Sequence, residues 1–500
     1  MNKFYITTTL PYVNSDPHIG FALEIVQADA IARFKRLMGY EVLFNTGTDE
    51  HGLKIYRKAE EIGMSPQKYC DKYAAKFDAL KEALNLTYTN FIRTTDEHHI
   101  KAAQEFWKKC ADNGDIYKKN YKVKYCVGCE LEKTDSELVD GKCPVHPNLD
   151  IEQIEEENYF FKFSKYQDAL LDLYKKNPKF VHPPHRLTEI RKFTERGLED
   201  FSISRLKEKM PWGVPVPDDA DHVMYVWFDA LVNYISTLGW PDKKYADWWP
   251  GVQIAGKDNL RQQSNMWQGM LMSAGIEPSK EVLIHGFITS EGKKMSKSLG
   301  NVVDPFSIVD EFGTDALRYY LLREIPFGND GDFNKKLFIE RYNSDLANNL
   351  GNLVNRVHTL ITRNEIEDFT FTKFHEPFKE KVDDTWKKYV SDMNKYNLHE
   401  AVFHVWRLVD FANKKMEEEK PWSLVRTDPD RAKAILCNLL EVIRHISIMI
   451  SPFIPYSSCL IRRQIGLPIE IDNKNEDGWG VTTGWNRLGE GSIIFPRIEI

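Results

Sequence analysis

The apolar positions of the first forty residues change their period over a short distance. Residues 4–8 are all aromatic or β-branched, which predicts a buried strand. Residues 11–17 are rich in proline, asparagine, serine and aspartate, which favours a turn. After Gly20, apolar residues recur three, four and seven positions apart until Gly39, which predicts an amphipathic helix. Strand, turn and helix therefore follow one another, and the helix begins close to His18.

The start of this helix is a candidate anion site. The first backbone N–H groups of a helix have no partner within it, and together with the helix dipole they favour a negative charge. Gly20 lets such a group approach the backbone closely. An ordinary first turn between a strand and a helix has the same pattern, so a second signal is needed to decide between the two interpretations.

Strand and helix patterns alternate over residues 1–116 and resume over residues 222–335. Strands are predicted at residues 41–46, 91–94, 225–228, 252–255 and 282–288. Alternating strands and helices predict a parallel sheet covered by helices, with ligands beyond the carboxyl ends of the strands. Residues 117–221 break the rhythm, since they are rich in lysine and glutamate and contain cysteines. We therefore predict one α/β domain that is interrupted by an insertion.

The strand patterns end at about residue 335, and long helical patterns follow. These helices are predicted at residues 336–364, 375–396, 398–418 and 430–450, with short connections between them. Antiparallel packing of such helices predicts a helix bundle over residues 336–500.

The composition is typical of a globular protein that does not enter a membrane. Of the 500 residues, 42% are hydrophobic and 28% are charged, and no basic and apolar signal peptide begins the chain. The most apolar late stretch, residues 434–454, contains Glu441, Arg444 and His445, which favours a buried helix. The net charge is −7, so only local patches are expected to meet a polyanion. Scattered cysteines are expected to be reduced, which favours a cytoplasmic protein.

Three cysteines and a histidine in the insertion have the spacing of a metal site. Cys126 and Cys129 form one pair, and Cys143 and His146 form a second pair with the same two-residue gap. Three thiolates and one imidazole suit tetrahedral Zn²⁺ and leave no open position, so the metal is expected to be structural. The alternative is a chance grouping of four residues in a loop.

A second candidate loop comprises residues 292–300, after the last predicted strand. Lys294 and Lys297 lie on it among small residues, and the loop precedes a helix that begins near Asp304. Two lysines on such a loop can clamp a polyphosphate. Taken alone, a lysine-rich loop is more often solvated surface.

Together, the two loops resemble the signature motifs of class I aminoacyl-tRNA synthetases, and their details look like the methionyl subfamily. Residues 18–21 match the His-x-Gly-His motif except at Phe21, and residues 294–298 match Lys-Met-Ser-Lys-Ser in full. Residues 47–52, 200–205 and 225–229 and the zinc knuckle are also similar, so the resemblance covers essentially the whole chain. It implies a Rossmann-like catalytic domain, a zinc-bearing insertion and an α-helical anticodon-binding domain.

The resemblance also implies a reaction. Methionine would be activated by ATP, with Mg²⁺, and passed to the 3' end of tRNA(Met); in-line displacement of this kind needs positioning and charge stabilisation but no protein nucleophile. The implied catalytic residues are His18, Lys294 and Lys297. The implied ATP-binding residues are Pro11, Asn14, His18, Gly20, Phe21, His285, Gly286, Lys294 and Lys297. The implied residues for L-methionine are Leu10, Tyr12, Asp49, Trp227, Ala230, Tyr234, Asn259 and Gln263, and those for the anticodon are Asn348, Asn352, Arg356 and Trp422.

Three positions depart from the family pattern and leave alternatives open. Phe21 replaces the second histidine of the signature, which removes a hydrogen-bond donor from the ATP site. Asn259 and Gln263 stand where the family usually has an apolar residue and a histidine, so the amino-acid pocket is expected to be more polar. The alternatives are a class I synthetase-like ligase for another small apolar amino acid and a non-catalytic tRNA-binding relic. Because no further tRNA-binding domain follows the bundle, we expect a monomer.

Overall fold

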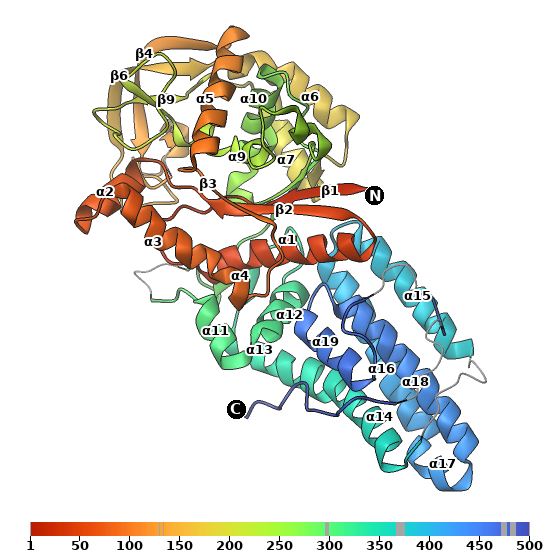
Figure 1. Cartoon of the computed structure of the whole chain (residues 1–500). Helices are drawn as coiled ribbons and strands as arrows, with labels where there is room; N and C mark the ends of the chain where they lie inside the picture. Colours follow the sequence, from red (N-terminus) through yellow and green to blue (C-terminus); the bar gives the residue numbers. More distant parts are fainter. Residues whose placement is uncertain are drawn as a thin grey trace.

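The computed structural model of the protein describes residues 2–129, 131–133, 135–295, 300–366, 376–471, 478–480 and 487–499. Figure 1 shows a sheet in the middle of the molecule, with helices on both of its faces and a helix bundle that extends away from one side. The predicted α/β class is confirmed by a central sheet of parallel strands. Among the described residues, none of the helices combines the length and the apolar character needed to cross a membrane.

The central sheet has the strand order β3-β2-β1-β11-β12-β7, and every pair in it is parallel. Its strands are β1 (Lys3–Thr7), β2 (Glu41–Thr48), β3 (Asn90–Arg93), β7 (Val181–His182), β11 (Val252–Gly256) and β12 (Glu281–His285). The chain leaves β1 on one side towards β2 and returns on the other side as β11. Ligands of such sheets bind where the strand order reverses, so the fold points to the carboxyl ends of β1 and β11.

Helices of the catalytic half cover both faces of this sheet (Figure 1). Helix α1 (Ile19–Leu37) lies with α3 (Pro66–Asp78) and α4 (Leu80–Ala83) on one face, and α5 (Glu97–Asp112) and α10 (Trp267–Ser273) lie on the other. The sheet therefore separates two apolar cores, one around α1 and the other around α5 and α10. The predicted strands at residues 4–8, 41–46, 91–94 and 252–255 and the first helix are confirmed.

The insertion forms a small antiparallel sheet of its own. Its strand order is β5-β4-β6-β8, from β4 (Ile116–Cys126), β5 (Leu131–Lys133), β6 (Glu152–Phe161) and β8 (Phe201–Ser202). β4 and β6 pair along their length, from Ile116 opposite Phe161 to Tyr125 opposite Glu152. This pairing fixes the end of β4, where Cys126 lies. Helices α6 (Gln167–Lys176) and α7 (Pro184–Glu195) follow, and β7 between them joins the edge of the central sheet.

Two strand predictions were wrong in part. Residues 225–228 do not form a strand, since β10 (His222–Met224) ends before them and α8 (Val226–Ala230) follows at once. A short apolar run that is buried on all sides has no periodicity to separate strand from helix, which explains the error. The predicted strand at residues 282–288 is divided into β12 and β13 (Ile288–Ser290), and β13 pairs with β14 (Gly331–Phe333) outside the central sheet.

The C-terminal part is a bundle of long helices, as predicted (Figure 1). Its main helices are α13 (Lys335–Arg341), the π-helical η7 (Tyr342–Gly351), α14 (Asn352–Arg363), α15 (Glu376–Met393), α16 (Leu398–Glu419), α17 (Pro421–Thr427), α18 (Pro429–Ile450) and α19 (Pro455–Gln464). The predicted helix at residues 336–364 corresponds to α13, η7 and α14, which follow one another without a break.

Helix α12 (Thr314–Glu324) joins the bundle to the catalytic half through the buried side chain of Arg318. The guanidinium Nη2 of Arg318 lies 2.7 Å from Oδ2 of Asp29, which belongs to α1. Arg318 also donates hydrogen bonds to the carbonyl oxygens of Phe453, Pro452 and Leu84, over 2.8–3.0 Å. One side chain thereby contacts α1, the end of α4 and the turn between α18 and α19, so it fixes the bundle against the helix that begins at His18.

Candidate active site

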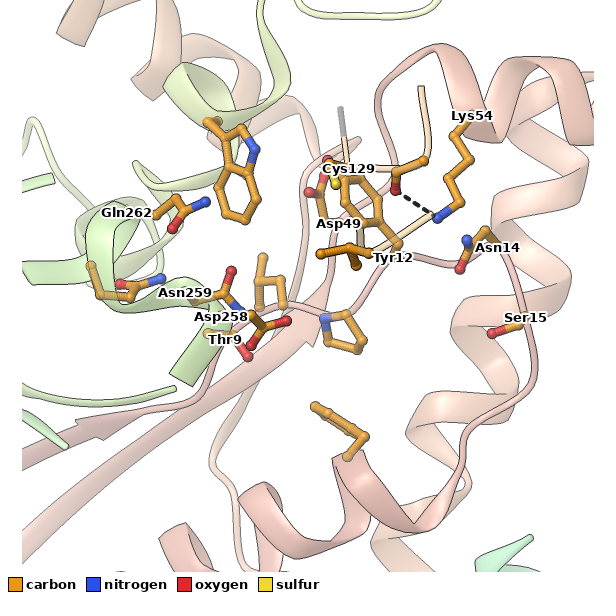
Figure 2. Close-up of a pocket in the computed structure, with 18 of the residues that line it drawn as sticks. Thr9, Tyr12, Asn14, Ser15, Asp49, Lys54, Cys129, Asp258, Asn259 and Gln262 are labelled. Atoms are coloured by element: carbon orange, nitrogen blue, oxygen red, sulfur yellow. Dashed lines mark hydrogen bonds between the residues drawn. The ribbon is translucent and has the colours of Figure 1, made fainter. Parts of the chain in front are cut away.

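A cavity of about 700 Å³ lies at the carboxyl ends of β1 and β11, where the fold predicts a ligand site. Figure 2 shows its walls, with Tyr12 and Asn14 from the turn after β1, Asp49 from the end of β2, and Asp258, Asn259 and Gln262 from the segment after β11. The cavity is also lined by these residues predicted from the sequence: Leu10, Pro11, His18, Phe21, Trp227, Ala230, Tyr234, Gln263 and Lys294. The fold therefore brings most of the predicted site residues into one space.

The start of α1, the anion site predicted from the sequence, does not have the unpaired N–H groups that were expected there. The N–H of Ile19 donates to the carbonyl oxygen of Val303, and those of Phe21 and Ala22 donate to the carbonyl oxygen of His18. His18 is the N-cap of α1, and its Nδ1 accepts a hydrogen bond from the backbone N–H of Gly20 over 3.0 Å. A Cβ atom at position 20 would lie 2.8 Å from Cε1 of His18, so only glycine leaves room for the histidine ring. Lys294 is exposed and lines the same cavity. Lys297, the other predicted lysine, lies outside the described residues.

Phe21 faces the cavity as one member of an aromatic pair. Its ring packs edge-on against Phe77 of α3, with centroids 5.4 Å apart and planes at 82°. Both residues line the cavity. The departure from the signature therefore replaces a polar donor with an apolar wall, and edge-to-face packing is a favourable arrangement for that wall.

Two carboxylates near the anion-binding end were missed from the sequence. Oε1 of Glu24 accepts hydrogen bonds from the backbone N–H (2.7 Å) and the hydroxyl (2.6 Å) of Thr9, and Thr9 lines the cavity. Oε2 of Glu24 lies 2.8 Å from Nε2 of His285. Asp258 lines the cavity directly (Figure 2). A glutamate within the apolar stripe of a predicted helix was the signal that could have identified Glu24.

His285 and Gly286 lie behind the wall of the cavity. Burial alone would lower the pKa of His285, but the hydrogen bond to Glu24 and the charge of that carboxylate outweigh burial and raise the pKa. A Cβ atom at position 286 would lie 2.0 Å from the carbonyl oxygen of Asn329, so the glycine lets the chain before β14 pack closely. His285 therefore does not line the cavity itself but positions Glu24, which in turn fixes Thr9 in the cavity wall.

At the other end of the cavity, backbone pairing places Asp49 beside the first turn. The N–H of Asp49 donates to the carbonyl oxygen of Pro11 over 3.0 Å, and Tyr12 and Asp49 form an isolated parallel bridge. The side chain of Asp49 is buried. Because a buried carboxylate favours a positively charged partner, this end suits an ammonium group.

The aromatic wall differs from the sequence prediction in one respect. Trp227 and Tyr234 do not lie on one helix, since Trp227 belongs to α8 and Tyr234 to α9 (Asn233–Ser236). The hydroxyl of Tyr234 accepts a hydrogen bond from Nε2 of Gln263 over 2.7 Å, and the hydroxyl of Tyr5 donates to the carbonyl oxygen of Tyr234 over 2.9 Å. Gln263 thus makes this part of the cavity wall polar and orients the tyrosine.

A buried carboxylate holds the two short helices together. Asp229 of α8 lies 2.6 Å (Oδ2) from Nδ1 of His51 and 2.8 Å (Oδ1) from Nε2 of His99. Nδ1 of His99 lies 2.8 Å from the hydroxyl of Ser236 on α9. Burial would raise the pKa of Asp229, but the charges and hydrogen bonds of the two histidines outweigh it and lower the pKa. The network joins the aromatic wall to the turn that carries Asp49.

The predicted metal ligands come together at the edge of the cavity. One ligand atom from each of Cys126, Cys129, Cys143 and His146 lies within 4.8 Å of the other three. Sγ of Cys129 is 3.5 Å from Sγ of Cys143 and 3.2 Å from Nδ1 of His146. Ligands of a tetrahedral zinc ion are separated by roughly 3.5–3.8 Å, so this donor set fits a metal ion of that kind.

This cysteine–histidine group also forms part of the cavity wall. Cys129 and His146 line the cavity, as do Gly128 and Val145. A Cβ atom at position 128 would lie 2.5 Å from Cγ of His146, so the turn requires glycine. Nζ of Lys54 donates to the carbonyl oxygen of Gly128 over 3.3 Å (dashed line in Figure 2), which ties the group to α2 (Leu53–Glu61).

Comparisons with known proteins identify the family. A family profile described as tRNA synthetases class I (M) matches residues 4–153 and 147–358, and one described as the anticodon binding domain of methionyl tRNA ligase matches residues 368–483. The chain belongs to the methionyl family of class I tRNA synthetases. The methionine–tRNA ligase of Thermotoga maritima is 42% identical over 99% of this chain and 80% of its own length. That of Brucella suis is 42% identical over 99% of this chain and 98% of its own length.

A solved structure of a family member has the same fold. The Mycobacterium tuberculosis methionyl-tRNA synthetase in complex with methionyl-adenylate superposes with a TM-score of 0.95 at 38% sequence identity. The likeness covers 99% of this chain and 100% of that chain. The shared architecture therefore includes the sheet, the insertion and the bundle.

Of the four residues predicted for the anticodon, Trp422 lies in the stretch that matches the anticodon-binding profile, and the other three lie in the preceding helices η7 and α14. Asn348 in η7 and Asn352 at the start of α14 are exposed. The guanidinium of Arg356 lies 5.3 Å from the centroid of the Trp422 ring, and its Nη1 pairs with Glu417 over 2.7 Å. Trp422 is 38% exposed, so its ring face is accessible next to a cation. The surface has the amides, guanidinium and aromatic ring that unpaired bases can contact.

Proposed function

We propose that this protein is a methionine–tRNA ligase, which activates L-methionine with ATP and transfers it to the 3' end of tRNA(Met) for protein synthesis. One observation carries the proposal. A single cavity has an anion-binding helix start with a lysine at one end, and a buried carboxylate with an aromatic wall at the other. These are the groups needed for a polyphosphate and for the ammonium and thioether of methionine, and the family relation supports the same assignment.

At the nucleotide end, the protein stabilises charge and positions the phosphates. The carboxylate of methionine attacks the α-phosphorus of ATP, an O–P bond forms, and the bond to the leaving pyrophosphate breaks. His18 binds the phosphates at the positive end of the α1 dipole, with Pro11, Asn14, Gly20 and Phe21 around them. Lys294 and Lys297 bind the departing pyrophosphate, and a Mg²⁺ ion bound with ATP would neutralise part of its charge. His285 and Gly286 lie near the adenine, and His285 holds Glu24, which fixes Thr9 in the cavity wall beside Asp258.

At the amino-acid end, Asp49 binds the ammonium group and the aromatic wall receives the side chain. Trp227 and Tyr234 give the thioether favourable contacts between sulfur and aromatic rings. Leu10, Tyr12, Ala230, Asn259 and Gln263 complete this end of the cavity.

The remaining parts of the chain serve metal binding and tRNA recognition. Cys126, Cys129, Cys143 and His146 bind one structural Zn²⁺, which fixes the knuckle that forms part of the cavity wall. Asn348, Asn352, Arg356 and Trp422 contact the anticodon by hydrogen bonds and stacking. The protein acts as a monomer in the cytoplasm.

ATP–pyrophosphate exchange with each amino acid in turn tests the proposal. Exchange with methionine is the expected result. Exchange only with another small apolar amino acid would replace the substrate assignment, and no exchange with any amino acid would indicate a protein that binds tRNA without activating a substrate.

The Lys297→Ala variant tests the lysine loop. We expect a normal fold and an exchange rate at least ~100-fold lower, because a positive charge on the pyrophosphate is lost in the transition state. Lys293→Ala changes an exposed lysine of the described part of this loop, which lies outside the proposed site, and serves as the matched control. An unchanged rate in Lys297→Ala would refute the role assigned to that residue.

A further inference from the structure

A groove of about 480 Å³ lies on the helix bundle, against the helix that carries two of the residues proposed for the anticodon. Its first wall is α14, which contributes Asn355, Thr359 and Arg363. Its second wall is the C-terminal segment 489–493, and Figure 1 shows this end of the chain crossing the bundle beside α14. The groove shares no lining residue with the cavity of the proposed active site.

One face of α14 carries both the groove and the proposed anticodon residues. Residues three, four and seven positions apart lie on the same side of an α-helix. Asn352 and Arg356 therefore share their face with Asn355, Thr359 and Arg363. At a rise of about 1.5 Å per residue, Thr359 and Arg363 lie roughly 5 and 10 Å beyond Arg356 along the helix axis. A nucleic-acid strand bound at Arg356 can therefore continue into the groove along one face.

The C-terminal wall of the groove is held in place by hydrogen bonds. Nε2 of Gln464 on α19 donates to the carbonyl oxygen of Ser492 over 2.6 Å and to its hydroxyl over 2.8 Å. The N–H of Gly489 donates to the carbonyl oxygen of Gln464 over 2.9 Å, and its own carbonyl oxygen lies 2.9 Å from Nε2 of His358. A Cβ atom at position 491 would lie 2.6 Å from Cε1 of His358, so Gly491 is required for this close packing.

The side chains that face the groove limit the kind of ligand. Asn355 and Arg363 are exposed, and neither side chain has a hydrogen bond or an ion pair with another residue that the structure describes. Among the lining residues, Arg363 is the one with a fixed positive charge and Glu490 is the one with a carboxylate. The groove therefore offers hydrogen bonds rather than a cationic clamp. An amide, a hydroxyl and a guanidinium group suit the donor and acceptor edges of an unstacked base.

We propose that this groove takes one unpaired nucleotide of the tRNA loop directly beside the anticodon, with Asn355 and Arg363 bound to its base. This inference rests on the proposed function, because it extends the anticodon surface of Asn352 and Arg356 along α14. Proteins that recognise RNA sequence commonly do so on loop bases that are splayed out of the stack.

Aminoacylation of tRNA(Met) transcripts tests the inference. In Asn355→Ala and in Arg363→Gln we expect kcat/KM for tRNA to fall by at least ~5-fold, mainly through KM, because hydrogen bonds to the nucleotide are lost. ATP–pyrophosphate exchange with methionine requires no tRNA and should be unchanged. Lys387→Gln removes an exposed positive charge from α15 of the same bundle and is the matched control, with both activities unchanged. Circular dichroism of each variant reports whether the helices are retained.

Transcripts that lack one base show whether the groove binds that base. One transcript lacks the base directly 5' of the anticodon, and another lacks the base directly 3' of it. We expect one of the two to lose at least ~5-fold in kcat/KM with the unchanged protein. With that transcript, Asn355→Ala should cause no further loss, because the base that Asn355 contacts is already absent. A purely structural effect of the substitution would instead be equal for all transcripts.

The outcomes separate this inference from the proposed function. Normal exchange and normal aminoacylation in both groove variants overturn the inference alone. Losses in the variants that are equal for all transcripts also overturn it, since no base is then recognised. If the unchanged protein does not aminoacylate tRNA(Met), the proposed function fails and filter binding of the same transcripts decides. Weaker binding of the intact transcript by Arg363→Gln then supports the groove, and equal binding overturns it.

Discussion

Replacing Asp229 tests whether its buried carboxylate supports the residues proposed to bind methionine. It is fully buried and lies within hydrogen-bond distance of His51 and His99, at 2.6 and 2.8 Å. In Asp229→Asn the volume is kept, but one side-chain oxygen becomes an NH₂ group that faces a histidine. A hydrogen bond to a charged group contributes about 1.5–3 kcal/mol, so the loss of one and the weakening of the other should cost roughly 3 kcal/mol.

The position of Asp229 decides which substrate's binding the lost hydrogen bonds weaken. His51 is two residues from Asp49, and His99 reaches α9 through Ser236, so the network supports the groups that face the ammonium and the side chain of the amino acid. If about 1.4 kcal/mol of the cost falls on the bound state, the KM for methionine rises ~10-fold. The KM for ATP should change by less than ~3-fold, because the nucleotide end is built on α1 and the loop before α11 (Pro305–Phe312).

Exchange kinetics and urea denaturation measure the two effects separately. Methionine is varied at saturating ATP, and ATP is then varied at saturating methionine. Asp221→Asn, an exposed aspartate of the preceding loop, is the matched control and should change neither constant nor the stability. A fall in stability with both KM values unchanged would show that Asp229 has only a structural role, and an equal rise in both would refute its assignment to the amino-acid end.

Three further predictions concern other parts of the chain. Cys126→Ser should lower the zinc content measured by mass spectrometry towards zero, and a full equivalent of metal would contradict the knuckle. Burial would raise the pKa of Glu441, but its hydrogen bonds to Arg444 and His445 lower it from 4.5 to about 2. This carboxylate therefore adds roughly 3 kcal/mol to the free energy of unfolding above pH 4.5, and this contribution is lost as the pH falls towards 2. Glu441→Gln should be less stable than the unchanged protein at pH 7 and should lose less stability on acidification. If the stability of the variant depends on pH as that of the unchanged protein does, the prediction is refuted. In Phe21→His, loss of the ring contact to Phe77 should lower the free energy of unfolding by about 1 kcal/mol. The restored hydrogen-bond donor should raise the rate of ATP–pyrophosphate exchange by up to ~100-fold, and a slower rate would show that the apolar wall is needed.

The features that could be predicted from the sequence are those encoded by neighbouring residues. The strand, turn and helix around His18 lie within one stretch of chain, and the structure reproduces them. The ligand group at Cys126 and His146 depends on two local pairs and one short loop, so its four atoms fall within 4.8 Å as the spacing required. Such features need little information about the tertiary fold.

The features that could not be predicted depend on residues far apart in the chain. Glu24 meets His285 across 261 positions, and Asp229 meets His51 across 178. No spacing rule connects such residues, because the sheet alone brings them together. The erroneous strand at residues 225–228 has a related cause, since a buried apolar run takes its conformation from its tertiary surroundings rather than from its own periodicity.

Helix α1 links the cavity to the helix bundle. It begins at His18 beside the anion-binding end, continues to Glu24, which holds Thr9 and His285, and reaches Asp29, about 16 Å from its start, which pairs with Arg318. Since Arg318 also binds the turn between α18 and α19, any displacement of the bundle relative to the sheet must break this buried pair or move α1 with it. Breaking a buried ion pair is costly, so the two halves are fixed to each other at the helix whose N-cap, His18, lines the cavity. The placement of the helix bundle and the geometry at His18 are therefore set by the same element.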